Sequence, residues 1–134
     1  MKMKDRKMRL KDKVVLITGG AAGIGKATAV RFAEEGATVS IGDVNEEVGQ
    51  ATLQALDGDH SFHKVNVADR QAVQEWVDGV VEKHGRVDVL VNNAGILRDR
   101  TFRKMTLDDF DDVVRVHLTG TAYVTHAAWP LMYE

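Results

Sequence analysis

Three glycines follow an apolar run near the start of the chain. Residues 14–17 have the branched, apolar composition of a buried strand, and Gly19, Gly23 and Gly25 come soon after it. Gly19 lets the chain turn off the strand, Gly23 lets backbone N–H groups approach a pyrophosphate, and Gly25 lets the next helix pack closely. Because the first turn of a helix carries unpaired N–H groups, this spacing predicts a dinucleotide phosphate site. A tight turn without a ligand is the alternative.

A carboxylate stands 20 residues after Gly23, at the end of a second apolar run. Residues 37–42 are predicted to form a buried strand, and Asp43 follows directly. A carboxylate at this distance accepts hydrogen bonds from an adenosine ribose and repels a 2′-phosphate. Since no Lys or Arg lies between residues 36 and 59, NAD is favoured over NADP. The alternative is that Asp43 caps the helix expected from residue 45.

Two carboxamides and two small residues follow a third apolar strand. Residues 87–91 are predicted to form this strand, and Asn92, Asn93, Ala94 and Gly95 come directly after it. Small residues there let the chain pass close to a nicotinamide ribose. Asn side chains can also bridge strand ends to neighbouring backbone, and the two interpretations are compatible.

The elements that must position these residues alternate between strand and helix. Strands are predicted at 13–18, 37–42, 60–65 and 87–91, and helices at 23–36, 45–56, 69–84 and from 107 onward, with a loop to about 106. Such alternation is typical of a parallel sheet covered on both faces. We therefore predict an α/β fold, a Rossmann-like doubly wound parallel sheet of about four strands in the order 3-2-1-4, and incomplete.

Two helices have apolar residues near a helical period. The third helix is expected to bury one face made of Val73, Trp76, Val77 and Val80. The first is expected to bury a face made of Ile24, Ala27, Val30 and Ala33. Pro130 is expected to kink or fray the last helix.

Composition excludes several classes of protein. The 134 residues are 44% apolar and 28% charged with a net charge of −2, which is ordinary for a soluble globular domain and points to neither nucleic acid nor membrane partners. Residues 1–9 are expected to be a basic, disordered leader before one domain over 10–134. We expect no metal site, because cysteine is absent and the five histidines lack ligand spacing. With no signal-peptide pattern, a cytoplasmic location is expected.

Residues 18–25, Asp43 and residues 92–95 together resemble the short-chain dehydrogenase/reductase family, over residues 9–134. The family transfers hydride between NAD(P) and an alcohol/carbonyl pair. The resemblance assigns a common role, contact with the cofactor, to Gly19, Ala21, Gly23, Ile24, Gly25, Asp43, Asn66, Val67, Asn93, Ala94 and Gly95. At Asn66 the family commonly has Asp, and an amide can still contact the adenine edge.

A finer resemblance involves residues 92–100, 116–118 and 124–130, which are similar to the (3R)-hydroxyacyl-CoA dehydrogenase unit of peroxisomal multifunctional enzymes. It implies an acyl thioester substrate and a catalytic role for His117, which stands where most members have an Asn that orders a relay water. The alternatives are a 3-oxoacyl-carrier-protein reductase, a sugar or steroid alcohol dehydrogenase, a non-catalytic nucleotide-binding module, and a His117 that only packs. Arg98 and Arg100 could meet a CoA phosphate or be solvated loop charges.

The family's catalytic Ser and Tyr-x-x-x-Lys are not found in these 134 residues. Tyr123 has Ala127 four residues later, and Tyr133 is followed by one residue. The domain is therefore expected to be truncated before that segment, which leaves open whether this chain turns over substrate. The fourth strand would then be an apolar edge, and self-association through that strand or the last helix is predicted.

Overall fold

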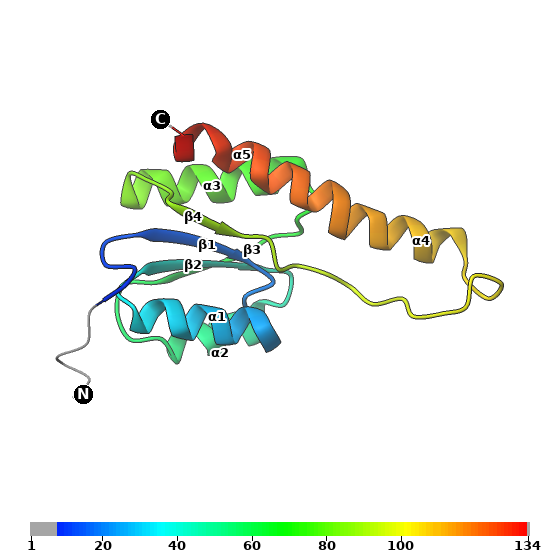
Figure 1. Cartoon of the computed structure of the whole chain (residues 1–134), viewed down its shortest axis with the longest axis horizontal. Helices are drawn as coiled ribbons and strands as arrows, with labels where there is room; N and C mark the ends of the chain where they lie inside the picture. Colours follow the sequence, from blue (N-terminus) through cyan, green and yellow to red (C-terminus); the bar gives the residue numbers. More distant parts are fainter. Residues whose placement is uncertain (1–7, 134) are drawn as a thin grey trace.

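A computed structural model describes residues 8–133 as one four-stranded parallel sheet with helices on both faces (Figure 1). In chain order the elements are β1 (Val14–Thr18), α1 (Gly23–Glu34), β2 (Thr38–Asp43), α2 (Glu46–Gln54), β3 (Ser61–Lys64), α3 (Arg70–His84), β4 (Val89–Val91), α4 (Leu107–Val114), the π-helix η2 (Arg115–Gly120) and α5 (Thr121–Tyr133). The strands lie in the order β3-β2-β1-β4. The fold class and strand order expected from the sequence are confirmed.

The central strand β1 is buried on both of its faces. Its side chains alternate, so that Val14 and Leu16 join one core cluster while Val15 and Ile17 join the other. Figure 1 shows α1 and α2 below the sheet and α3 and α5 above it. A parallel strand covered on both faces is a continuous apolar run in the sequence, and residues 14–17 have this pattern.

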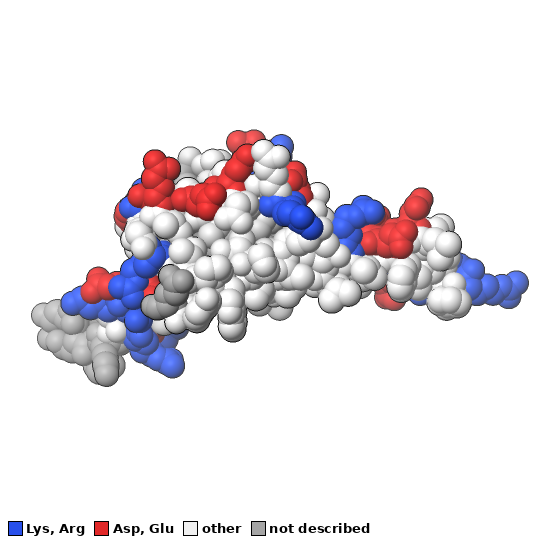
Figure 2. Space-filling view, turned by 90° about the horizontal axis from the view of Figure 1, so that it is seen from above, with Lys and Arg blue, Asp and Glu red and all other residues white. Residues whose placement is uncertain are grey.

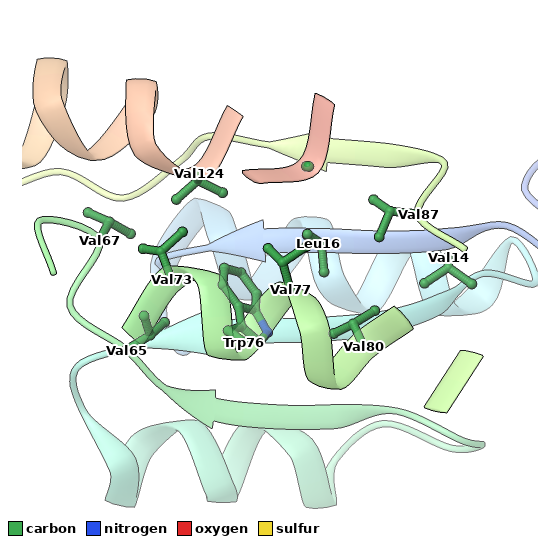
Figure 3. Close-up of a cluster of buried hydrophobic side chains, with 11 residues drawn as sticks. Val14, Leu16, Val65, Val67, Val73, Trp76, Val77, Val80, Val87 and Val124 are labelled. Atoms are coloured by element: carbon green, nitrogen blue, oxygen red, sulfur yellow. The ribbon is translucent and has the colours of Figure 1, made fainter. Parts of the chain in front are cut away.

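The helix α3 buries the face that its apolar period predicts. Its buried residues are Val73, Trp76, Val77 and Val80 (Figure 3). The Trp76 indole N–H donates to the Ser40 hydroxyl at 2.9 Å, so the polar edge of this large side chain is satisfied. Gly42 in β2 leaves room for the ring, because a Cβ there would lie 2.7 Å from it.

The face expected for α1 is confirmed in its second half, where Val30 and Ala33 are partly buried and pack against the core. Ile24 and Ala27, by contrast, are exposed, and the buried residues of this helix are Gly25 and Ala29. At Gly25 the helix lies so close to the Gly19 carbonyl and the Asn93 amide that only a residue without a Cβ fits there. A sequence period based on hydrophobicity alone misses such a contact.

The last helices form an arm that extends beyond the sheet. Figure 1 shows the segment after β4 running outward and α4 returning toward α5 as one continuous rod. The π-helical turn η2 joins the two, and the helix continues past Pro130 to Tyr133. Within residues 8–133, β4 pairs only with β1, and no helix has the length and apolarity needed to cross a membrane.

The basic leader expected over residues 1–9 falls mostly outside the described residues. Of that segment, Met8 is exposed, and the backbone N–H of Arg9 donates to the buried Glu35 carboxylate at 3.0 Å. The boundary at residue 10 stays a prediction.

The Asp88 carboxylate joins the beginnings of β1 and β4. It accepts the Val14 backbone N–H at 2.8 Å and forms an ion pair with Arg86 at 2.6 Å. Burial raises the pKa of Asp88, but the hydrogen bonds from Arg86 and Val14 outweigh it and leave the pKa below its ordinary value. The ionised carboxylate therefore stabilises the fold.

We predict that Asp88→Ala lowers the free energy of unfolding by about 1–3 kcal/mol, because the Val14 N–H loses its acceptor. Urea denaturation measures this, with Asp111→Ala, an exposed acid on α4, as the control. The difference from the wild type should be full above the ordinary carboxylate pKa and disappear as the pH falls through the depressed pKa of the folded state. A difference that persists unchanged into strong acid contradicts the role of the charge.

Candidate functional site

The carboxyl ends of β1, β2 and β4 meet at one edge of the sheet and surround a pocket of about 380 Å³. In a parallel sheet a crevice opens at the carboxyl ends of the strands where the strand order reverses, and here β2 and β4 lie on opposite sides of β1. Eight of the residues expected to contact the cofactor line this pocket: Gly19, Gly23, Asp43, Asn66, Val67, Asn93, Ala94 and Gly95. Residues distant in sequence thus share one cavity.

The glycine-rich turn leaves the first turn of α1 open. Gly19 and Gly23 have φ values of +65° and +56°, a region that side chains disfavour. A Cβ at Gly23 would meet nothing within 4 Å, so the backbone there faces open space. Ala22 is the N-cap residue and supplies no side-chain cap, and the first turn carries no acid. This helix end therefore suits a phosphate group.

Gly25 does not line the pocket but supports its wall. A Cβ at this position would collide with the Gly19 carbonyl oxygen and lie 2.6 Å from the Asn93 amide nitrogen. Ile24 is 79% exposed beside the turn and does not line the pocket either. Both residues thus flank the glycine-rich turn at the edge of the pocket.

The Asp43 carboxylate is fixed by two backbone N–H groups. It accepts from Ala21 at 3.1 Å and from Asn45 at 3.0 Å. Ala21 is buried behind the pocket, and its carbonyl accepts the Thr52 hydroxyl at 2.6 Å. The alternative that Asp43 caps the next helix is wrong, because Asn45 is the N-cap and accepts from Val48 at 3.1 Å.

The opposite wall depends on Thr18. Its hydroxyl oxygen accepts the backbone N–H groups of Asn93 and Ala94, both at 2.9 Å. The Asn93 side chain donates to the Gly19 carbonyl at 3.1 Å, whereas Asn92 donates to Thr125 on α5 at 3.0 Å. Asn93 therefore joins the two walls of the pocket, and Asn92 anchors the last helix.

Asn66 and Val67 form the wall beyond β3. The Asn66 side-chain oxygen accepts the Ala68 backbone N–H at 3.0 Å, so the NH₂ group of the amide is left as the donor. Val67 is buried and lies against Gly120, where a Cβ would collide with it. The π-helical turn that contains Gly120 thereby reaches the pocket wall.

His117 lies outside the pocket and contacts the backbone that forms it. Its Nε2 atom is 3.1 Å from the Ile96 nitrogen and 2.9 Å from the Ile96 oxygen. The ring covers Gly95, where a Cβ would lie 2.6 Å from it. This geometry lets His117 hold the loop after β4, and its role in a proton relay stays a prediction.

Several residues that line the pocket were not expected. They are Ala22, Gly42, Val44, Val65, Ile96 and Val116. All six are sequence neighbours of predicted site residues, so the motifs could have indicated them. Val116 stands beside His117, and η2 brings it to the pocket from far along the chain. No group of three His, Asp or Glu residues in the range 8–133 is arranged to hold a metal ion.

Comparisons with known proteins agree with this geometry. A family model described as short chain dehydrogenase matches residues 13–134. The 3-oxoacyl-(acyl-carrier-protein) reductase of Thermotoga maritima is 48% identical over 130 residues, which cover 95% of this chain and 53% of that protein. The peroxisomal hydratase-dehydrogenase-epimerase of Saccharomyces cerevisiae is 38% identical over 135 residues, covering 93% of this chain and 15% of that protein.

Among solved structures, NAD⁺-bound xylitol dehydrogenase superposes with a TM-score of 0.87 at 32% identity, over 92% of this chain and 49% of that one. The chain spans about half the length of the Thermotoga relative and of this structure. The family model, by contrast, covers nearly all of the 134 residues, and the glycine-rich turn, Asp43 and residues 92–95 that carry the resemblance all lie at the site. The chain therefore belongs to the short-chain dehydrogenase family.

Proposed function

We propose that this chain binds NAD and serves an oxidoreductase that transfers hydride at C3 of a 3-hydroxyacyl thioester. One observation carries the cofactor part: the fixed Asp43 carboxylate and the uncapped first turn of α1 line the same pocket. A carboxylate suits ribose hydroxyls, and an uncapped helix end suits a pyrophosphate. No other described cavity combines these two features.

The residues that line the pocket fit NAD in a single orientation along the pocket. The pyrophosphate would lie at Gly19 and Gly23, the adenosine ribose at Asp43, and the adenine against Asn66 and Val67. The nicotinamide would then lie beside residues 93–95. NAD held in this way supplies a hydride acceptor, and the groups of this chain bind and orient it.

The thioester part rests on similarity. The Thermotoga relative is named for a 3-oxoacyl substrate on an acyl carrier protein. Residues 92–100, 116–118 and 124–130 are similar to a hydroxyacyl-CoA dehydrogenase unit. A carrier-protein reductase that uses NADPH is the second candidate, and Asp43 argues against it because a carboxylate repels a 2′-phosphate.

Isothermal titration of the chain with NAD and NADP tests the cofactor. We expect NAD to bind at least about tenfold tighter, a difference of ~1.4 kcal/mol. Asp43→Asn should narrow this preference to about twofold, because the like-charge repulsion is removed. Asp57→Asn, an exposed acid after α2, should leave it unchanged. Preference for NADP by the wild type would favour the carrier-protein reductase instead.

A matched pair of helical glycines tests the turn. Gly25→Ala should abolish NAD binding and destabilise the fold by about 1–3 kcal/mol, because its Cβ collides with the turn. Gly79→Ala on α3 meets open space and should stabilise by about 0.5–1 kcal/mol with unchanged NAD affinity. Calorimetric titration and thermal melting measure the two effects. Normal NAD binding by Gly25→Ala contradicts the proposed phosphate position.

We also infer that the chain self-associates through its last helix. Figure 2 shows a broad uncharged area over this face, and Leu118, Trp129 and Tyr133 are each more than half exposed on η2 and α5. Light scattering at about tens of micromolar should give a mass above the 14.8 kDa monomer. The substitution Trp129→Ser should lower the measured mass toward that of the monomer. A clean monomer contradicts the inference.

A further inference from the structure

The loop after β4 leaves the cofactor pocket and becomes basic. Ile96 lines the pocket, and four cations, Arg98, Arg100, Arg103 and Lys104, follow within eight residues. With Asp99, residues 98–104 carry a net charge of +3, whereas the whole chain carries −2. Since four residues span at most about 14 Å, Arg100 lies within that distance of Ile96.

One carboxylate faces two of these arginines. Asp109 lies 3.1 Å from Nε of Arg100 and 3.9 Å from Nε of Arg98. The hydrogen bond from the Thr106 backbone N–H, with contributions from the Thr106 side chain and Arg100, lowers the pKa of Asp109 below its ordinary value. Asp109 is therefore ionised at neutral pH. Residues 98–104 together with Asp109 carry a net charge of +2.

A groove lies between this loop and the start of α4. Its lining combines cations and hydroxyls with two acids: Asp99, Arg100, Thr101, Lys104, Thr106 and Asp109. The ion pair uses Nε of Arg100, and no hydrogen bond within residues 8–133 uses its Nη atoms. Arg103 does not line the groove. At the end of the molecule farthest from the sheet, Figure 2 shows basic side chains (blue) with acidic ones (red) nearby.

We propose that this groove binds a phosphate of the phosphopantetheine carrier on an acyl thioester. The proposal rests on the proposed function, which places the thioester at the nicotinamide end of the pocket, beside Ile96. From there the carrier arm would follow the loop outward to the groove. The two acids of the lining balance its two cations, so recognition depends on directed donors, which are the Nη atoms of Arg100, the Lys104 ammonium group and the hydroxyls of Thr101 and Thr106. Such groups bind a phosphate by charge-assisted hydrogen bonds.

Calorimetric titration of the NAD-saturated chain with coenzyme A tests the groove. Arg100→Gln should weaken binding about tenfold, because a hydrogen bond to a charged group is removed. Arg103→Gln removes the same charge from the same loop outside the groove and should change binding less than about twofold. Thermal melting checks that both variants fold. Equal weakening by the two variants, or no binding of coenzyme A, overturns the proposal.

Shorter probes identify the phosphate. Pantetheine, which has no phosphate, should not bind, and binding equal to that of coenzyme A overturns the proposal. 4′-Phosphopantetheine that binds as well as coenzyme A supports the arm phosphate, which coenzyme A and acyl carrier protein share. Tighter binding of coenzyme A supports coenzyme A as the carrier. NAD is titrated separately, so failure to bind NAD counts against the proposed function and not against the groove.

Discussion

The hydroxyl group of Thr18 ties the end of β1 to the end of β4. It is buried, and its oxygen accepts two successive backbone N–H groups from the loop after β4. Parallel pairing of Ile17 with Val91 brings these ends to the same level. The Asn93 side chain then reaches the Gly19 carbonyl, so the glycine-rich turn and the loop after β4 are held as one unit. The pocket depends on this connection, because these hydrogen bonds fix the position of one wall relative to the other.

Close packing at Gly25 extends the same constraint to α1. The helix begins directly against the Gly19 carbonyl and the Asn93 amide, and no side chain fits between them. The N–H groups of its first turn are therefore brought to the pocket without a competing cap or acid. Asp43 completes the arrangement from the other side of β1, because its two backbone hydrogen bonds orient it before any ligand binds.

The loop and helices after β4 have a different physical character. They contain many exposed apolar side chains, and within the described residues they touch the sheet mainly through α5, which packs over β4 and α3. His117 and the π-helical turn hold the first part of this segment to the pocket, through Ile96 and Val67. A site at the edge of a compact domain is thus connected to an arm with exposed apolar side chains.

Local sequence was sufficient wherever one kind of interaction dominates. The apolar runs of β1 and β2, the buried face of α3 and the glycine spacing are each set by burial or backbone geometry, and they predicted the fold and most of the pocket lining. Tertiary structure decided what depends on contacts between distant segments. At the start of α1, Gly25 is buried while Ile24 and Ala27 are exposed. Asn45, and not Asp43, caps α2, and Val116 and His117 reach the pocket edge through a π-helical turn. Hydrophobic periodicity predicts which face of a helix is buried, but it does not identify the residues that this face will contact. These positions are determined by particular neighbours, which only the folded chain brings together.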